Sequence, residues 1–297
     1  MTTPLISIPE LHELYHTAVH CSLTAQFASA NRFSGDFRGV FRGMGMELED
    51  SRPYVPGDDL RHLDWRATAR AGRPVTKIFR EERQRQVVIV FDRHPGMNFG
   101  SRWQRKGSAA ISLAALLGFR AFSGHDPLTG VILEQEPTWF HARRHFDSIL
   151  RFLVTAAAPL PRQLSGTGDE RWHHLFQQIA VRLAGNQTVY LLSDFHDFPM
   201  PAPAELTQLQ RRHTLVAIHV VDAGEAIVPR VGLLRLADPA TGRRYVVDSS
   251  SPELADRVRE KIHDRWNRIE RLFHRHAVAY LRLFTHDDIG RRFPEVW

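Results

Sequence analysis

The stretch VVIVFD (Val87–Asp92) is a continuous apolar run, rich in β-branched residues, that ends in an acid. Such a run is typical of a strand at the centre of a parallel sheet, because a central strand is buried on both faces. The stretch TVYLLSD (residues 188–194) repeats the pattern. Strand-like and helix-like segments alternate from about residue 84 onward. We therefore predict a doubly wound, mostly parallel α/β sheet over residues 84–297.

The domain organisation follows from where this alternation begins. Residues 1–83 are expected to hold an N-terminal helix with a 3.6-residue apolar period and, after it, a small appended unit of helix and strands. We expect residues 31–83 to pack on the sheet domain. A hairpin insertion is predicted near residues 230–248, because two strand-like stretches flank the turn PATG (residues 239–242).

The composition is that of a globular protein. The chain has 297 residues, of which 43% are hydrophobic and 24% are charged. Its single cysteine, Cys21, excludes a disulfide within the chain, and we expect it to be a small core residue. No apolar run reaches the roughly 18–20 residues that span a bilayer. The N-terminus lacks the basic start and apolar core of a signal peptide, so a soluble cytoplasmic protein is expected.

The charge balance is basic, with 39 Lys and Arg against 33 Asp and Glu and a pI of about 10.0. A pI above roughly 9 permits nucleic acid or another polyanion as a partner. The basic residues are interleaved with acids, however, which favours an ordinary solvated surface. The chain also lacks a zinc-finger spacing and a glycine-rich RNA-binding signature.

Two acids follow strand-like runs, at the positions where open α/β sheets bind ligands. Asp92 and Asp194 are therefore expected to lie near each other at the carboxyl edge of the sheet. The pattern resembles a von Willebrand factor A-like domain, whose first strand ends in Asp-x-Ser-x-Ser and whose fourth strand ends in an acid. In that fold these residues and a loop threonine hold Mg²⁺, which prefers oxygen ligands. Thr167 stands for the loop threonine here.

The match to that metal-ion-dependent adhesion site is incomplete. The chain reads DRHPG from Asp92 onward, so that His94 and Gly96 replace the two hydroxyl residues. Imidazole is a softer ligand than Mg²⁺ prefers, and glycine offers no side chain. We expect little or no Mg²⁺ binding and hence no cofactor. Asp92 and Asp194 are expected instead to accept hydrogen bonds from loop amides or to pair with Arg93.

The run YVPGDDLRHLDWRATAR (residues 54–70) combines acids, arginines and a tryptophan. Its equal numbers of acids and arginines favour a structural ion-pair network that also offers a docking surface, since bidentate Arg–carboxylate pairs satisfy each other. A two-metal hydrolase site is the alternative. Trp65 is expected to pack this segment onto the sheet. The acids are Asp58, Asp59 and Asp64, and the arginines are Arg61, Arg66 and Arg70.

The same run is part of a longer signature over residues 52–83. It resembles the signature of the domain-of-unknown-function 58 family of bacterial proteins, whose members carry a von Willebrand A-like domain. The resemblance extends to a glycine-rich lead-in and to the late hairpin, so it covers most of the chain. The matching residues are Arg52, Tyr54, Pro56, Gly57, Asp58, Asp59, Arg61, Asp64, Trp65, Ala69, Arg70, Lys77, Phe79, Glu81, Glu82 and Arg83.

The resemblance implies a binding role beside a MoxR-type AAA+ ATPase, in systems that assist the assembly or maturation of a client protein. The lack of a Gly-x-x-x-x-Gly-Lys-[Ser/Thr] phosphate loop agrees with a non-catalytic adaptor. The loops around Asp92, Arg93, His94 and Asp194 are the first candidate for the docking face. A basic nucleic-acid-binding protein, whose phosphate contacts would weaken steeply with salt, and an EDTA-sensitive metal-dependent hydrolase are the alternatives.

Overall fold

The computed structural model describes residues 4–24, 51–55, 64–77, 86–141, 145–164, 167–237 and 243–291. The chain divides into two compact units. Residues 1–34 and 85–297 form the first, here called the sheet unit, and residues 35–84 form the second, here called the signature unit. Each unit is described by itself.

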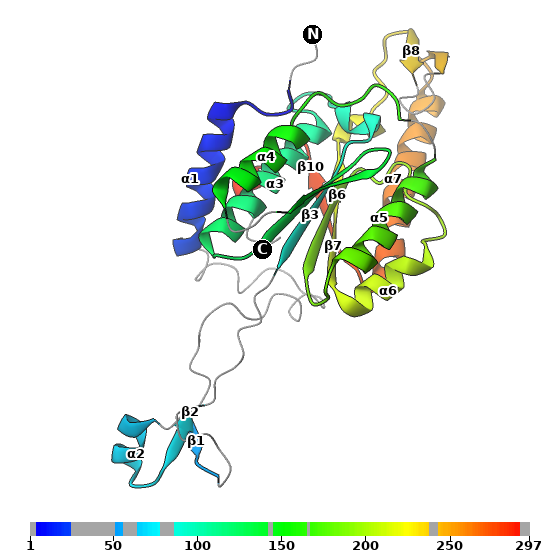
Figure 1. Ribbon diagram of the computed structural model, residues 1–297. Coiled ribbons are helices and arrows are strands. Elements are labelled where there is room, and N and C mark those ends of the chain that lie inside the picture. The colour runs from blue at the N-terminus through cyan, green and yellow to red at the C-terminus, as the bar shows by residue number, and fades with distance from the viewer. Residues whose placement is uncertain are drawn as a thin grey trace. The chain divides into compact units, whose positions relative to one another are not determined.

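A six-stranded sheet forms the centre of the sheet unit (Figure 1). Its strand order is β10-β7-β6-β3-β4-β5, and every neighbouring pair is parallel except β4 and the edge strand β5. Every residue of β3 is buried, as its apolar run predicts. The strands are β3 (Val87–Asp92), β4 (Leu128–Leu133), β5 (Pro137–His141), β6 (Thr188–Ser193), β7 (Thr214–Val221) and β10 (Ala279–Phe284).

Helices cover both faces of this sheet (Figure 1). Alternate side chains of β3 enter two separate cores: Ile89 and Phe91 join one, and Val88 and Val90 join the other. The structure thus confirms the doubly wound architecture expected for a von Willebrand A-like domain. The first core is covered by α1 (Ile8–Thr24), α3 (Lys106–Ser123) and α4 (Phe146–Ala156), and the second by α5 (Gly168–Arg182), α6 (Ala204–Arg212) and α7 (Pro252–Arg275).

The first helix belongs to the sheet unit, which corrects the expected grouping of all of residues 1–83. Leu11 and Ala18 of α1 are buried in the first core, and α1 packs against α3. An amphipathic helix must cover its apolar stripe, and α3 provides that cover. The side chain of Cys21, predicted to be a core residue, lies outside the described part of this helix.

The connections at the carboxyl edge of the sheet hold the predicted hairpin and two 3-10 helices. β8 (Leu233–Ala237) and β9 (Arg244–Asp248) pair antiparallel, in the connection between β7 and α7. The short helix η4 (Ala223–Ala226) precedes this hairpin, and η3 (Pro95–Asn98) follows β3. These segments surround the ends of the strands at which the candidate site lies.

The described part of the signature unit is a short helix beside two paired strands. Asp64 caps α2 (Trp65–Ala71) by accepting hydrogen bonds from the amides of Arg66 and Ala67. Gly72, with φ of 64°, ends the helix in the left-handed conformation that glycine favours. The strands are β1 (Ser51–Pro53) and β2 (Val75–Lys77), which pair antiparallel.

Candidate functional site

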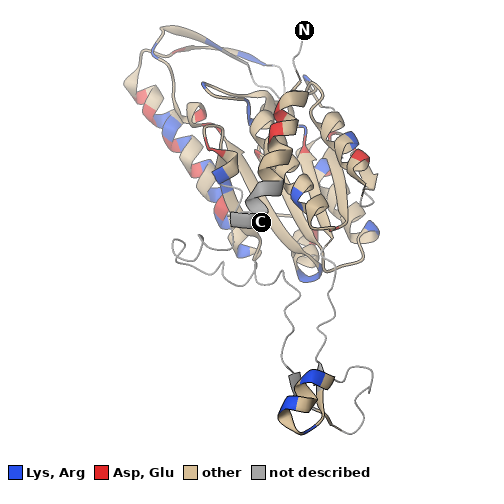
Figure 2. Cartoon of the chain, turned by 90° about the vertical axis from the view of Figure 1, so that its left-hand side faces the viewer, with Lys and Arg blue, Asp and Glu red and all other residues tan. Residues whose placement is uncertain are grey.

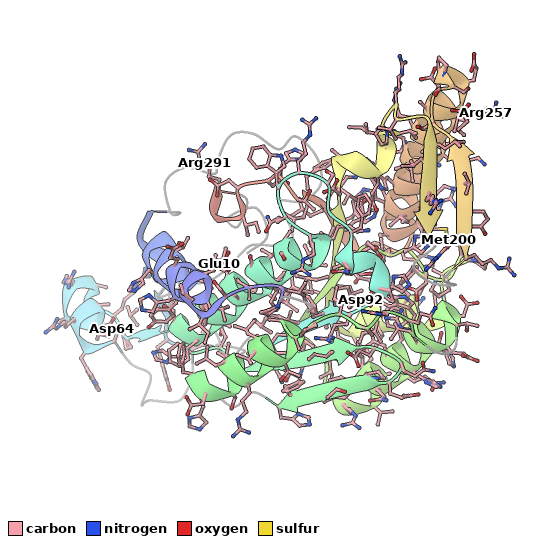
Figure 3. All side chains as sticks on the ribbon, turned by 90° about the horizontal axis from the view of Figure 1, so that it is seen from above. Glu10, Asp64, Asp92, Met200, Arg257 and Arg291 are labelled. Atoms are coloured by element: carbon pink, nitrogen blue, oxygen red, sulfur yellow. The ribbon has the colours of Figure 1, made fainter. Side chains whose placement is uncertain are left out.

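The candidate site lies at the carboxyl edge of the sheet, where β3 and β6 end side by side. These strands are parallel neighbours, with Phe91 opposite Leu192, so that Asp92 and Asp194 leave the same edge. Ser193, which precedes Asp194, donates its hydroxyl to Oδ2 of Asp92 at 2.6 Å. Figure 3 looks onto this edge, with Asp92 labelled within the sheet unit. The prediction that the two acids lie near each other is confirmed.

Asp92 is completely buried, and both of its oxygens are used. Oδ1 accepts hydrogen bonds from Nη2 of Arg171 at 2.6 Å and from the amide of His94 at 3.0 Å, while Oδ2 accepts the hydroxyl of Ser193. Burial raises the pKa of Asp92, and the guanidinium of Arg171 opposes that rise. A buried carboxylate is strongly destabilising unless it is paired. Arg171 supplies the positive charge that stabilises the buried Asp92.

Arg171 is a partner that the sequence analysis missed. It lies in the first turn of α5, is itself buried, and also donates to Asp197 and to the carbonyls of Leu133 and Glu134. Burial alone would lower the pKa of Arg171, but Asp92 and Asp197 raise it above its ordinary value. The fixed fork of donors on a guanidinium thereby ties the start of α5 to the ends of β3 and β4.

The second acid, Asp194, has a buried cation of its own. Nζ of Lys106, the first residue of α3, lies 2.6 Å from Oδ2 of Asp194 and 2.7 Å from Oε1 of Glu225. The amide of His196 donates to Oδ1 of Asp194 at 3.0 Å. Burial alone would raise the pKa of Asp194, but Lys106 holds it well below its usual range. Burial would likewise lower the pKa of Lys106, and the two carboxylates more than reverse this.

These residues do not fit a divalent cation. All four carboxylate oxygens of Asp92 and Asp194 already accept hydrogen bonds. Arg171 and Lys106 place a positive charge within 2.6 Å of each carboxylate, so a further cation would be repelled at short range. Among the described residues, no three His, Cys, Asp or Glu side chains are grouped so that they could hold a metal ion.

The other residues predicted for the metal site have structural roles. The hydroxyl of Thr167 caps α5 by accepting the amide of Glu170 at 3.3 Å. Nδ1 of His94, which is buried, accepts the amide of Gly96 at 3.0 Å. Gly96 leaves room for Asp194, because a Cβ at this position would lie 2.7 Å from Oδ2 of that acid. From its position in the motif, Gly96 could be recognised only as a lost ligand, because the close approach of Asp194 depends on the fold.

Of the two alternatives expected for the strand-end acids, the structure shows the hydrogen bonds from loop amides, and Arg93 pairs instead with Glu134. Its Nε lies 2.7 Å from Oε1 of Glu134, and its two terminal nitrogens donate to carbonyls at and just beyond the end of α4. A helix leaves its last carbonyls without partners inside the helix, and Arg93 supplies donors for them. The carbonyls are those of Thr155, Ala156, Ala158 and Pro159.

A third strand-end acid, Asp222 after β7, was also missed, although TLVAIHVVD (residues 214–222) repeats the pattern of an apolar strand followed by an acid. It accepts hydrogen bonds of 2.6–3.1 Å from the amide and hydroxyl of Ser101, the amide of Gly224 and the hydroxyl of Thr285. Burial alone would raise the pKa of Asp222, but these bonds lower it. Asp222 thereby fixes the β3–α3 loop onto the end of β7.

The described residues of the signature run are exposed or half-buried. Trp65, Arg66 and Arg70 are exposed, Asp64 and Tyr54 are half-buried, and α2 contains no buried residue. The ion-pair network stays a prediction, because two of its three acids and one of its three arginines lie outside the described residues. The side chains of Arg52 and Lys77, and the whole of Pro56, Gly57, Asp58, Asp59, Arg61, Phe79, Glu81, Glu82 and Arg83, lie outside the described residues.

What the strand-end arrangement can do chemically is limited, because its polar groups satisfy one another. The hydroxyl of Ser193 donates to Asp92 and accepts the amide of Phe195 at 2.8 Å, so it is fully used in this network. The acids and their cations connect α3, α5 and three strand ends into one hydrogen-bonded assembly. Such an assembly can hold the loops at this edge in fixed positions.

The comparisons with known proteins found relatives that are described as uncharacterized, and solved structures of similar fold. An uncharacterized protein of Mycobacterium tuberculosis is 29% identical over 230 residues, which cover 75% of this chain and 69% of the relative. A Paracoccus denitrificans protein, described as an uncharacterized protein in the moxR 3′ region, is 34% identical over 96 residues, covering 32% of this chain and 90% of the relative.

Two of the similar solved structures each cover 71% of this chain. One is an aerotolerance-related membrane protein from Bacteroides fragilis (12% identity, 96% of that chain, TM-score 0.43), and the other is an uncharacterized membrane-spanning protein from Vibrio fischeri (13% identity, 97% of that chain, TM-score 0.24). Both are described as membrane proteins, which contradicts the predicted cytoplasmic location. In the described parts of the chain, every helix is too short or too polar to cross a membrane.

The family comparison also covers most of the chain. The model described as "Protein of unknown function DUF58" matches residues 50–269, from the start of the signature unit's first strand into α7. This range includes Asp92, Asp194 and both of their buried cations. It is well over half of the 297 residues, and the chain belongs to the DUF58 family.

Proposed function

We propose that this protein is a non-catalytic binding partner of a MoxR-type AAA+ ATPase and acts in the assembly or maturation of a client protein. The observation that carries the proposal is the relative named for its place in the moxR 3′ region. Membership of the DUF58 family supports the same association. The ATPase would supply nucleotide hydrolysis, and this chain would supply a binding platform.

The closed strand-end site supports the non-catalytic part of the proposal. A carboxylate that acts as a general base or a nucleophile must reach its substrate, whereas Asp92 and Asp194 are buried and engaged by Arg171 and Lys106. Opening the site would separate two buried ion pairs. These residues therefore serve better as a rigid base for the surrounding loops than as reacting groups.

We propose further that this site takes no Mg²⁺, because buried cations already occupy the acids. Calorimetric titration of the full chain with Mg²⁺ and with Mn²⁺ tests this, and we expect no saturable heat at millimolar metal. The test includes Asp92→Ala as the matched variant. A micromolar site that this substitution abolishes would overturn the proposal.

The association itself is tested by co-expression with the MoxR-type ATPase of the same cell and size-exclusion chromatography in ATP and in ADP. We expect co-elution in at least one nucleotide state and a changed ATPase rate in excess of this protein. If no complex forms in either state and the rate is unchanged, the proposal fails.

The nucleic-acid alternative is tested in parallel with a single-stranded oligonucleotide at low and high salt, because phosphate binding weakens steeply with salt. Figure 2 shows basic and acidic residues alternating along the long helix α7, which is the pattern of a solvated surface. We therefore expect weak oligonucleotide binding at physiological salt. Tight, salt-sensitive binding would instead favour the hypothesis that this protein binds nucleic acid.

A further inference from the structure

The residues first considered for docking cannot form a contact surface by themselves. Asp92, Arg93, His94 and Asp194 are each at most 6% exposed. A partner that approaches the carboxyl edge must therefore touch the loops that cover these residues. Two such loops are well described: the β3–α3 loop and the connection from β7 to β8.

These two loops expose large apolar side chains next to arginines. Trp103 is 76% exposed, and Ile227 and Val231 are 65% and 64% exposed. Singly exposed apolar residues are common, but a group of them on neighbouring loops marks an interaction site. We call the following residues the loop patch: Phe99, Arg102 and Trp103 of the first loop, and Ile227, Arg230 and Val231 of the second, all of which are exposed.

The two loops lie directly against each other. Gly224 approaches Ser101 so closely that a Cβ on Gly224 would lie 2.4 Å from Cβ of Ser101. Lys106 makes a second connection, because its Nζ binds Glu225 at 2.7 Å and lies 5.8 Å from the centre of the Phe99 ring. The apolar side chains of the two loops therefore belong to one region of the surface.

The buried network beneath the loop patch holds it in place. Ser101 is bound to buried Asp222 through its amide and its hydroxyl, and the side chain of Gln104 donates to the carbonyl of Thr285 at 3.0 Å. In the sequence, Trp103 lies between Ser101 and Gln104, which are both anchored. A surface that is already ordered loses less entropy when it binds a partner of defined shape. Trp and Arg are also the residues that most often dominate interface energies.

We infer that the loop patch docks the AAA+ ATPase, an assignment that rests on the proposed function. The complementary surface would be an apolar pocket for Trp103 and Ile227 with acidic side chains at its border. These acids of the partner would pair with Arg102 and Arg230. The carboxylate of Glu225, which belongs to the second loop, is already bound by Lys106. The structure favours a protein partner over the other classes. The buried network holds the loop patch in one shape, and such an ordered surface suits a partner of defined shape better than a fluid lipid surface or a flexible single strand.

The test is the affinity of purified full-length variants for the immobilised ATPase in the nucleotide state that supports the complex. Trp103→Ala should weaken binding by about tenfold or more, as expected for an anchor residue. Arg102→Glu should weaken it and make the remaining binding less sensitive to salt. Because Trp103 is largely exposed, its variant should unfold at the temperature of the wild type.

Two matched controls remove equally exposed apolar side chains elsewhere. Trp65→Ala acts on a tryptophan that is 72% exposed in the signature unit, and Val181→Ser acts on a residue of α5 that is 86% exposed. Both should bind the ATPase like the wild type. If Trp65→Ala abolishes binding while Trp103→Ala does not, docking lies in the signature unit and our assignment is wrong.

The remaining outcomes separate this assignment from the proposed function. If the wild type does not bind the ATPase, both fail together. If it binds and Trp103→Ala binds equally well, the assignment fails while the proposed function stands. Vesicles of phosphatidylethanolamine and phosphatidylglycerol and a single-stranded oligonucleotide serve as further probes. Trp103→Ala could instead weaken binding to the vesicles or to the oligonucleotide and leave ATPase binding unchanged. The loop patch would then serve a different class of partner, and the inference would be overturned.

Discussion

Two regions of this chain are rich in aspartates and basic residues, yet they differ completely in burial. At the carboxyl edge of the sheet, Asp92 and Asp194 are buried together with their partners Arg171 and Lys106. In the described part of the signature unit, Arg70 is exposed, and Asp64 is half-buried and caps a helix. The density of charges along a short segment thus reveals little about burial.

The difference arises from sequence separation. The buried pairs join residues 79 and 88 positions apart, which the sheet brings together. The charged residues described around α2 lie within one or two helical turns of each other, and Asp64 accepts the amides of Arg66 and Ala67. Removing one partner of a buried pair costs about 3–5 kcal/mol, whereas an exposed pair contributes about 0–1 kcal/mol. The following predictions test whether this contrast holds in solution.

The largest effect is expected for Arg171→Met. This change leaves Asp92 buried without its cation and should lower the free energy of unfolding by about 3–5 kcal/mol. Urea unfolding followed by circular dichroism measures it. Adding Asp92→Asn should restore part of the loss, because the neutral amide no longer requires a cation. A loss below about 1 kcal/mol in the single variant would show that the pair is solvated, and the contrast between the two regions would disappear.

A somewhat smaller effect is expected for Lys106→Met, about 3 kcal/mol at neutral pH, because the amide of His196 still binds Asp194. The folded-state pKa of Asp194 lies below its unfolded value, near 3.9. The pairing therefore stabilises the fold above that pH and is lost as the pH falls toward the folded-state pKa. Urea unfolding at pH 7, 5 and 3.5 should show the difference between variant and wild type shrinking at the lowest pH. A constant difference would contradict the assignment.

The third prediction concerns a buried group that has no ionic partner, His219 of β7, whose Nδ1 lies 2.6 Å from the hydroxyl of Tyr280. Burial lowers the pKa of His219 to about 3, below the unfolded value of about 6.5. Stability should therefore fall as the pH drops from 6.5 toward 3, by about 2 kcal/mol at pH 5. His219→Gln should remove this part of the acid sensitivity in urea unfolding.

The control for that experiment is His263→Gln, because His263 is exposed on α7. This variant should keep the pH dependence of the wild type. If the two variants behave alike, burial does not set the protonation of His219.

The smallest effects belong to the signature unit. Asp64→Ala removes the cap of α2 and should cost about 1 kcal/mol, whereas Arg70→Ala should change stability by less than about 0.5 kcal/mol. Hydrogen exchange of the α2 amides measures both locally. A loss of several kcal/mol for Arg70→Ala would contradict this expectation and favour the ion-pair network that was predicted for residues 54–70.

The strands and their polar ends could be predicted from the sequence because each is a local pattern. VVIVFD and TVYLLSD gave two central strands and the two acids that meet at one edge, and the turn PATG gave the hairpin. Asp222 could have been found by the same pattern. The buried charge network was assigned to the signature run only because acids and arginines are equally numerous there, and such counts carry no information about depth.

The partners of the acids could not be predicted, because pairing depends on strand order and helix placement. Arg171 and Lys106 look like ordinary first-turn residues, yet each lies in the apolar stripe of its helix. Arg171 shares a face with Leu175, and Lys106 shares one with Ala110. A basic residue in the apolar stripe of a helix, in a chain with two strand-end acids, is therefore a sequence signal for a buried ion pair.

Gly96 has a consequence for how this protein can evolve. The adhesion motif that the site resembles has a serine at this position. A Cβ here would lie 2.7 Å from Oδ2 of Asp194 and 2.9 Å from Nδ1 of His94. A mutation of Gly96 to serine would therefore disrupt the network around Asp194. A metal ion could not restore the lost stability, because Lys106 and Arg171 would still repel it. A lineage with this edge would need several simultaneous changes to gain the metal site, and the buried charges are therefore constrained together rather than one by one.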